Sequence, residues 1–140
     1  MTHQNAVSVV AAPLDAVERV VRDVEHWPRI ILGLEQVVET SYCRFTFSLR
    51  DRSSVRQVDV AVVAHPSEHR LVWHALAGPR FDGEIRLTAV DSGHTRVSLS
   101  ITADPAGFLA SVADLAHLGH DSAAVLDLQR LEAVVTGATA

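Results

Sequence analysis

An alternation of apolar and polar residues runs through the middle of the chain, from about residue 43 to residue 103. Apolar residues stand there at every second position, which is the spacing of a strand with one buried face. Strands of this kind are typical of an antiparallel sheet that covers a core on one side and meets water on the other. Short connections between them predict that consecutive strands are antiparallel neighbours.

Turn-forming residues divide this region, at positions 51–54, 65–68, 78–79 and 91–94. A further strand is predicted around Val37 and Val38. Within each strand of the alternating region, the apolar side chains fall on one face. The residues predicted to face inward are Cys43, Phe45, Phe47, Leu49, Val58, Val60, Val62, Leu71, Trp73, Ala75, Phe81, Gly83, Ile85, Leu87, Ala89, Val97, Leu99, Ile101 and Ala103.

A strand and two helical pieces are predicted before the sheet region. Residues 5–11 form a β-branched run suited to a strand. From Leu14 to Val24 the apolar residues return at helical spacing. Trp27-Pro28 is expected to break that helix, because the residue before a proline is pushed out of the helical region. One more short helical turn is predicted to follow.

A single long helix is predicted after the sheet, from Pro105 to about Val135, and residues 136–140 are expected to fray. One face of a large curved sheet needs a cover, and only this helix is long enough to provide it. The predicted fold class is therefore α+β, with about seven antiparallel strands wrapped around a long C-terminal helix. A length of 140 residues suits one domain, 1–140.

Composition removes several function classes. With 48% hydrophobic and 21% charged residues the chain is not of the disordered type, and its one cysteine excludes a disulfide scaffold. A net charge of −5 without a basic run argues against nucleic-acid binding. No apolar stretch approaches the length of a membrane span, and the expected location is the cytoplasm.

Several short phrases occur in a characteristic order along the chain. They are the first strand leading into Ala12-Pro13, then DVEHWP at 23–28, LVW at 71–73, GEIRL at 83–87, TRV at 95–97 and DLQRL at 127–131. In this order they resemble the START-related polyketide cyclase/dehydrase superfamily (SRPBCC), which has the helix-grip fold. The resemblance covers essentially the whole chain. It implies a cavity between the sheet and the last helix that holds a polyketide, a lipid or another apolar molecule.

One departure from the superfamily bears on activity. Its aromatase/cyclases tend to carry Trp, Ser and Arg at alternate inward positions of one mid-sheet strand, where this chain has Val58, Val60 and Val62. The arginine that would polarise a carbonyl is missing. The departure argues against aromatase/cyclase chemistry and leaves ligand binding untouched.

The candidate site consists of residues that the resemblance and the strand parity place at the cavity. Trp73 is either a cavity wall that stacks on a ligand or the largest residue of an ordinary core, and the phenylalanines share this ambiguity. The predicted ligand-binding residues are Ile31, Leu32, Phe45, Phe47, Val60, Val62, Trp73, Phe81, Leu99 and His117.

His117 and His120 are three residues apart on the predicted long helix and therefore lie on one side of it. They are interpreted as a solvated flank, as a polar contact to the cavity, or as two metal ligands. A metal site usually needs a third protein ligand, and the sequence offers none, so no metal and no cofactor are expected. His117 is the candidate acid/base residue if the protein is an enzyme.

Three functions remain open. The first is the binding of a small, largely apolar molecule, which the nearly unbroken apolar inner face favours. The second is a cyclase or dehydratase acting on a poly-β-ketone, which needs a positioned acid/base group. The third is a domain whose cavity is filled by its own side chains and which serves only association. The oligomeric state is left open, a homodimer included.

Overall fold

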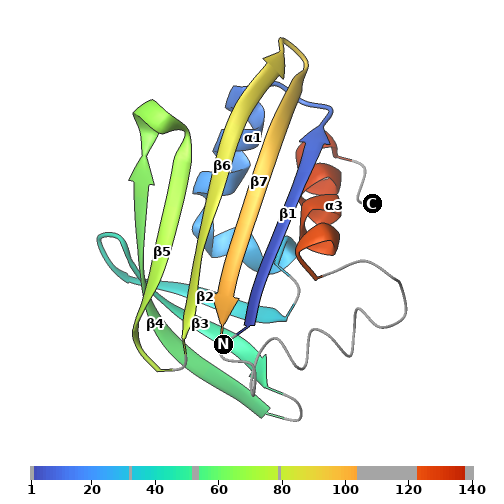
Figure 1. Ribbon diagram of the computed structural model, residues 1–140. Coiled ribbons are helices and arrows are strands. Elements are labelled where there is room, and N and C mark those ends of the chain that lie inside the picture. Colours follow the sequence, from blue (N-terminus) through green and yellow to red (C-terminus); the bar gives the residue numbers. More distant parts are fainter. Residues whose placement is uncertain (1, 32, 52–53, 79, 104–122, 138–140) are drawn as a thin grey trace.

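The computed structural model describes residues 2–31, 33–51, 54–78, 80–103 and 123–137. They form a seven-stranded antiparallel sheet in the order β1-β7-β6-β5-β4-β3-β2. Figure 1 shows the sheet curving strongly, so that β2 and β3 run across the direction of β6, β7 and β1, while β4 bends upward to run beside β5. The predicted sheet of about seven antiparallel neighbours is confirmed. The strands are β1 (Thr2–Val10), β2 (Leu34–Ser41), β3 (Arg44–Asp51), β4 (Ser54–His65), β5 (Arg70–Ala77), β6 (Phe81–Asp91) and β7 (His94–Ala103).

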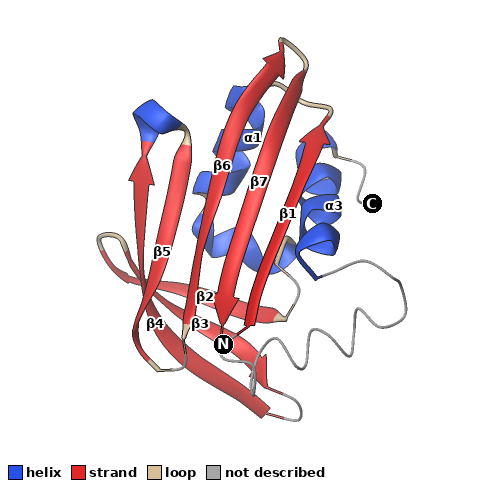
Figure 2. Ribbon diagram, in the orientation of Figure 1, coloured by secondary structure: helices blue, strands red, loops and turns tan. Residues whose placement is uncertain are grey.

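Three helical segments cover one side of this sheet, as Figure 2 shows: α1 (Leu14–Arg22), the 3-10 helix η1 (Val24–Arg29) and α3 (Ala123–Thr136). A short 3-10 helix, η2 (Pro66–Glu68), joins β4 to β5. α1 packs on β6 and β7, η1 contacts β2, and α3 lies mainly along β1. The cover is therefore shared by three segments, whereas the sequence assigned it to the last helix alone. Residues 104–122 of the predicted long helix lie outside the described residues.

The predicted strand parity is confirmed by burial. On β4, Val58, Val60 and Val62 are buried, while Asp59 and Val63 between and after them are exposed. The same alternation appears on β3, β5, β6 and β7. Ala89 is a correction, because it is exposed beside an irregularity near the end of the β6–β7 ladder. The other buried inward residues are Phe45, Phe47, Leu49, Leu71, Trp73, Phe81, Ile85, Leu87, Val97, Leu99 and Ile101.

The sheet bends where β5 leaves β6. Regular pairing between these strands ends at Trp73 opposite Gly83. Beyond that point a side chain replaces the backbone as the partner of β5. The Asp82 carboxylate accepts a hydrogen bond of 2.8 Å from the backbone N–H of Ala75. A register shift in the β4–β5 ladder lies beside the same place, at Asp59/Val60. Irregularities of this kind bend a strand and increase its twist.

Two local expectations are wrong. The first helix ends at Arg22, and Trp27-Pro28 lies within the following 3-10 helix instead of breaking α1. The indole Nε1 of Trp27 donates a hydrogen bond of 2.8 Å to the carbonyl of Val21, one of the last carbonyls of α1 that lack a helical partner. Cys43 is not part of the β3 face. It lies in the β2–β3 turn with φ of 61°, and its carbonyl accepts from the Val62 N–H.

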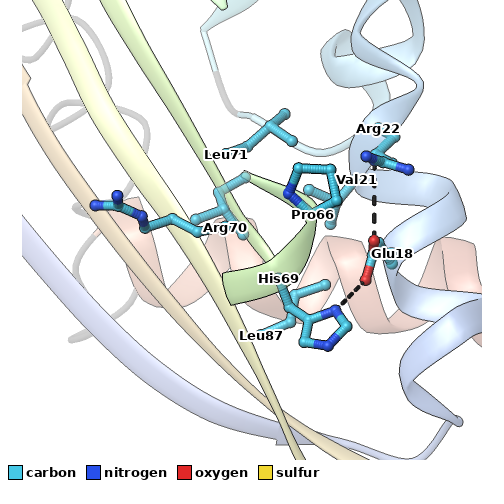
Figure 3. A pocket seen from close by; sticks show the side chains of 9 residues that line it. Glu18, Val21, Arg22, Pro66, His69, Arg70, Leu71 and Leu87 are labelled. Atoms are coloured by element: carbon cyan, nitrogen blue, oxygen red, sulfur yellow. Dashed lines mark hydrogen bonds and ion pairs between the residues drawn. The ribbon is translucent and has the colours of Figure 1, made fainter. Parts of the chain in front are cut away.

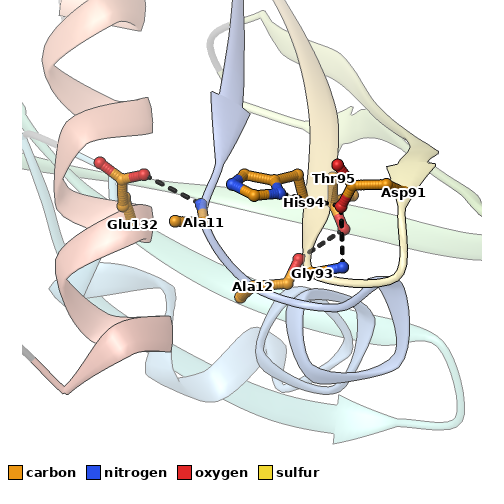
Figure 4. A network of polar contacts seen from close by, with 7 residues as sticks. All are labelled: Ala11, Ala12, Asp91, Gly93, His94, Thr95 and Glu132. Atoms are coloured by element: carbon orange, nitrogen blue, oxygen red, sulfur yellow. Dashed lines mark hydrogen bonds and ion pairs between the residues drawn. The ribbon is translucent and has the colours of Figure 1, made fainter.

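A polar network ties the far end of the sheet together (Figure 4). The hydroxyl of Thr95, which is fully buried, donates a hydrogen bond of 2.9 Å to the carbonyl of Ala12. The N–H of Ala11 donates to the Glu132 carboxylate on α3 at 3.2 Å. The segment between β1 and α1 is thereby fixed to β7 on one side and to α3 on the other.

Among the described residues, no helix has the length and apolar character needed to cross a membrane.

The β6–β7 hairpin carries a carboxylate whose ionisation depends on its neighbours. Asp91 Oδ1 lies 2.8 Å from His94 Nδ1 and accepts the backbone N–H of Gly93, also at 2.8 Å. The hydrogen bond from His94, followed by that from Gly93, lowers the pKa of Asp91 below its ordinary value of 3.8. A lowered pKa in the folded state means that the ionised carboxylate stabilises the hairpin at neutral pH and that this contribution is lost as the pH falls through the folded pKa.

We predict that His94→Gln raises the pKa of Asp91 toward its ordinary value, because the strongest hydrogen bond to the carboxylate is weakened. An NMR titration of the Asp91 carboxyl carbon in both proteins measures the shift. Arg96→Gln, on the neighbouring exposed position of β7, is the control and should leave the Asp91 titration in place. An identical Asp91 titration in the His94 variant contradicts the assignment of the cause.

Candidate functional site

The side of the sheet that faces α1, η1 and α3 is almost entirely hydrocarbon. Its inward positions on β3 to β7 are filled mainly by valine, leucine, isoleucine, phenylalanine and tryptophan, with Ala75, Gly83 and Thr95 among them. The only buried polar residues of the described chain are Ser48, Thr95 and Asp127. Such a surface can bind an apolar molecule by excluding water, and it offers few groups for orienting one.

Four aromatic rings meet at the centre of this inner face. Trp27 and Trp73 have their ring centroids 5.0 Å apart at an interplanar angle of 66°. Phe47 lies edge-on to Trp27 at 5.9 Å and to Phe81 at 5.9 Å. Trp73 and Phe81 close the ring of contacts at 6.0 Å. We call these four residues the aromatic cluster, and all of them are at most 1% exposed.

Trp73 lies flat across the neighbouring strand because its partner there is a glycine. A Cβ atom on Gly83 would overlap the Cζ2 and Cη2 atoms of the indole and come within 2.6 Å of the Ser100 carbonyl oxygen. Gly83 therefore provides the surface on which the indole rests. The Nε1 atom of Trp73 is buried and has no hydrogen-bond partner among the described residues.

Trp27 is held in the aromatic cluster from both sides. Its own indole N–H is bonded to the Val21 carbonyl, as described above. The guanidinium of Arg130 on α3 donates a hydrogen bond of 3.0 Å to the carbonyl of Pro28, which fastens η1 to α3. Sequence reasoning placed Trp27 in a loop and missed its role. The phrase HWP gave no periodic signal that could have located the side chain.

The space left between the sheet and the helices is small in the described structure. One apolar pocket of about 10 Å³ is lined by Val21, Trp27, Ile30, Ile31, Ile85 and Leu131. By this measure a cavity needs about 10–15 Å³ to hold a single water molecule, so the pocket is at that lower limit. The cavity expected between the phenylalanines, Trp73, Leu99 and the last helix stays a prediction, because residues 104–122 of that helix lie outside the described residues.

The predicted ligand-binding residues divide into two groups. Those that are described are all buried, on the inner face or next to it. Ile31 comes two residues after the end of η1 and lines the small apolar pocket. They are Ile31, Phe45, Phe47, Val60, Val62, Trp73, Phe81 and Leu99. Leu32 and His117 lie outside the described residues, as does His120.

Asp127 is a functional candidate that sequence reasoning did not single out. It lies on α3 and is 2% exposed, and it is the only buried carboxylate among the described residues. The signal was present in the sequence. Asp127 stands one position before Leu128 and four before Leu131, both of which are buried on the predicted inward stripe of the helix.

A second recess lies on the solvent side of α1, where η2 approaches the helix (Figure 3). His69 Nδ1 lies 2.7 Å from Glu18 Oε2, and Arg22 Nε lies 3.9 Å from the other oxygen of the same carboxylate. The adjoining groove measures about 410 Å³ and is largely open to solvent. Within this groove, Glu18 is paired with both Arg22 and His69. No cluster of three metal-ligating side chains occurs in the part of the chain that the structure describes.

We predict that Gly83→Ala destabilises the protein by about 1–3 kcal/mol, because the added methyl group forces the Trp73 indole off β6. Urea denaturation of the two proteins measures the difference. Gly93→Ala is the matched control, since a Cβ there meets nothing closer than Asp91 Oδ1 at 3.8 Å. A loss of stability equal in both variants would show that the Trp73 contact is not the cause.

The sequence matches one protein family over nearly its whole length. That family is described as "Polyketide cyclase / dehydrase and lipid transport", and the match covers residues 1–136. No curated protein matches the chain significantly.

Solved structures share the fold at low sequence identity. The ZhuI aromatase/cyclase from a Streptomyces species is 19% identical and superposes with a TM-score of 0.73, covering 96% of this chain and 93% of that one. A START superfamily protein from Mycobacterium smegmatis is 15% identical with a TM-score of 0.75, over 98% and 99% of the two chains. The di-domain ARO/CYC protein BexL is 21% identical with a TM-score of 0.66, and the match covers 96% of this chain and 47% of that one.

The likeness to these structures establishes the helix-grip fold, and the resemblance inferred from the sequence phrases is confirmed. With its match over residues 1–136, the chain belongs to the polyketide cyclase/dehydrase and lipid transport family.

Proposed function

We propose that this protein binds a small, largely apolar molecule between the inner face of the sheet and the segments α1, η1 and α3. The observation that carries the proposal is the continuous hydrocarbon lining, in which the described strands place no charged side chain. Membership of a family of cyclases, dehydrases and lipid-transport proteins supports a ligand-binding or cyclase role. The residues proposed to contact the ligand are Ile31, Phe45, Phe47, Val60, Val62, Trp73, Phe81 and Leu99.

The described residues of the inner face leave little room for a ligand, and we propose that side chains move apart to admit one. Sites for small molecules usually measure about 300–1,000 Å³, whereas the apolar pocket beside η1 measures about 10 Å³. The segment best placed to move is η1, because it is six residues long and carries Trp27 into the aromatic cluster. Its movement breaks the bonds from Trp27 to Val21 and from Arg130 to Pro28 while the ligand enters, and both bonds form again when η1 closes over the ligand.

We predict that a fluorescent apolar probe, N-phenyl-naphthylamine, binds to the protein and that Trp fluorescence changes with it. The chain has two tryptophans, and both belong to the aromatic cluster. Titration in the wild type and in Trp27→Phe separates the two signals. Native mass spectrometry of protein purified from its own host gives an independent test, since a bound metabolite adds its mass to that of the chain. If the probe does not bind and no mass is added, the binding proposal fails. The remaining function is then that of a domain which serves only association.

A matched pair of variants on β4 tests where the probe binds. Val60→Phe fills the inner face, where Val60 is fully buried, and should weaken probe binding about tenfold or more. Val63→Phe adds the same ring to the outer face, where Val63 is 42% exposed, and should leave binding unchanged. Thermal melting followed by circular dichroism checks that both variants remain folded. Equal weakening by the two variants argues against the inner face as the binding site.

A cyclase or dehydratase acting on a poly-β-ketone is the second candidate, and the burial of Asp127 favours it. An acid/base group is needed for enolisation or loss of water, and positioned acid/base catalysis typically contributes about 10²–10⁴-fold. Asp127→Asn should lower turnover of a poly-β-ketone substrate by that factor while probe binding is kept. His117→Ala tests the residue predicted from the sequence. Full turnover in both variants removes both groups from the mechanism.

A further inference from the structure

We propose that the ligand carries a carbonyl oxygen and that the indole N–H of Trp73 donates a hydrogen bond to it. The inference rests on the proposed binding function and narrows the class of ligand. It makes Trp73 the residue that orients the ligand within an otherwise apolar site. Few precisely placed polar groups in an apolar pocket are the usual means by which a protein fixes the orientation of a small molecule.

The first observation is the missing partner of Trp73 Nε1. The side chain is fully buried, and its N–H has no acceptor among the described residues. A buried donor without a partner is costly, so such groups are rare in folded proteins and call for an explanation. Trp27 provides the comparison within the same cluster, because its N–H is bonded to the Val21 carbonyl at 2.8 Å.

The inner face around Trp73 contains no side-chain acceptor. Trp73 is paired with Val62 on β4 and with Gly83 on β6. The inward neighbours along its own strand are Leu71 and Ala75. None of these four residues has an oxygen in its side chain. Since the described residues offer this indole no acceptor, we infer that a bound molecule supplies one.

The chemistry of the site favours a carbonyl over the other groups that could accept this bond. A water molecule at a buried site typically makes about three hydrogen bonds, and the hydrocarbon lining offers it one donor. A hydroxyl would bring a donor of its own that finds no acceptor on the same lining. An indole N–H can only donate. A carbonyl oxygen on a flat apolar framework satisfies the N–H and adds no unpaired donor.

Fluorenone and fluorene provide the test, because the two molecules have the same ring framework and differ in one carbonyl group. Calorimetry gives the dissociation constant of each, and their ratio defines the preference of the protein for the ketone. We expect Trp73→Phe to reduce this preference about two- to tenfold, which is the factor that one neutral hydrogen bond contributes. Trp27→Phe is the matched control and should preserve the preference, since the N–H it removes is already bonded to Val21.

Each outcome bears on a different claim. If neither compound binds to the wild type, the proposed binding function fails and the inference fails with it. If both bind and Trp73→Phe leaves the preference unchanged, the inference alone is overturned and the apolar site remains. An equal fall in the preference in both tryptophan variants also overturns the inference. The fall would then come from replacing an indole by a smaller ring and not from the loss of the Trp73 N–H.

A measurement on the wild type covers the case in which Trp73→Phe does not fold. With nitrogen-15-labelled tryptophan the protein gives two indole N–H signals, one for each tryptophan. Fluorenone should move the Trp73 signal downfield, as a new hydrogen bond does, and fluorene should not. Trp27→Phe identifies which signal belongs to Trp73. A Trp73 signal that responds alike to both compounds contradicts the hydrogen bond.

Discussion

The contact between the two tryptophans sets the distance between the sheet and its helical cover. Trp73 rests on β6 because Gly83 has no side chain, and Trp27 packs edge to face against that indole with centroids 5.0 Å apart. Trp27 in turn belongs to η1, which is fastened to α1 through Val21 and to α3 through Arg130. Sheet, α1, η1 and α3 are therefore joined through one pair of side chains. A change in this contact reaches every element that encloses the site.

Polar groups are distributed so that the inner face stays dry. The ion pairs of the described chain lie on its surface, for example Arg70 and Arg86 with Glu84 on the outer side of the sheet. Surface pairs of this kind contribute little to stability. The fold is held instead by apolar burial, with the Thr95–Ala12 hydrogen bond closing one end. The proposed binding and the folding of the chain thus depend on the same hydrocarbon surface.

Much of the fold could be predicted from the sequence because a period of two residues determines which side of a strand faces the core. That rule located Val60, Trp73 and Phe81 on one face, and burial agrees. It says nothing about Trp27, whose position is determined by a tertiary hydrogen bond and by packing against a distant strand. It also failed at Cys43, where the tight turn between β2 and β3 overrides the alternation. Asp127 stands four residues before Leu131, on the inward stripe of α3. This spacing alone could have predicted a buried carboxylate at this position.

The pairing of β1 with β7 constrains the order in which the chain can fold. Thr2 lies opposite Ala103 and Val10 opposite Thr95, so the first strand finds its partner only when the last one has been made. Until then both edges of β1 are unpaired, and its sequence THQNAVSVV contains neither an acidic residue nor lysine or arginine to discourage wrong partners. Pairings between distant parts of a chain form slowly. During synthesis on the ribosome the remaining strands can assemble into hairpins one after another. The pairing of β1 with β7 completes the sheet and is therefore its last step.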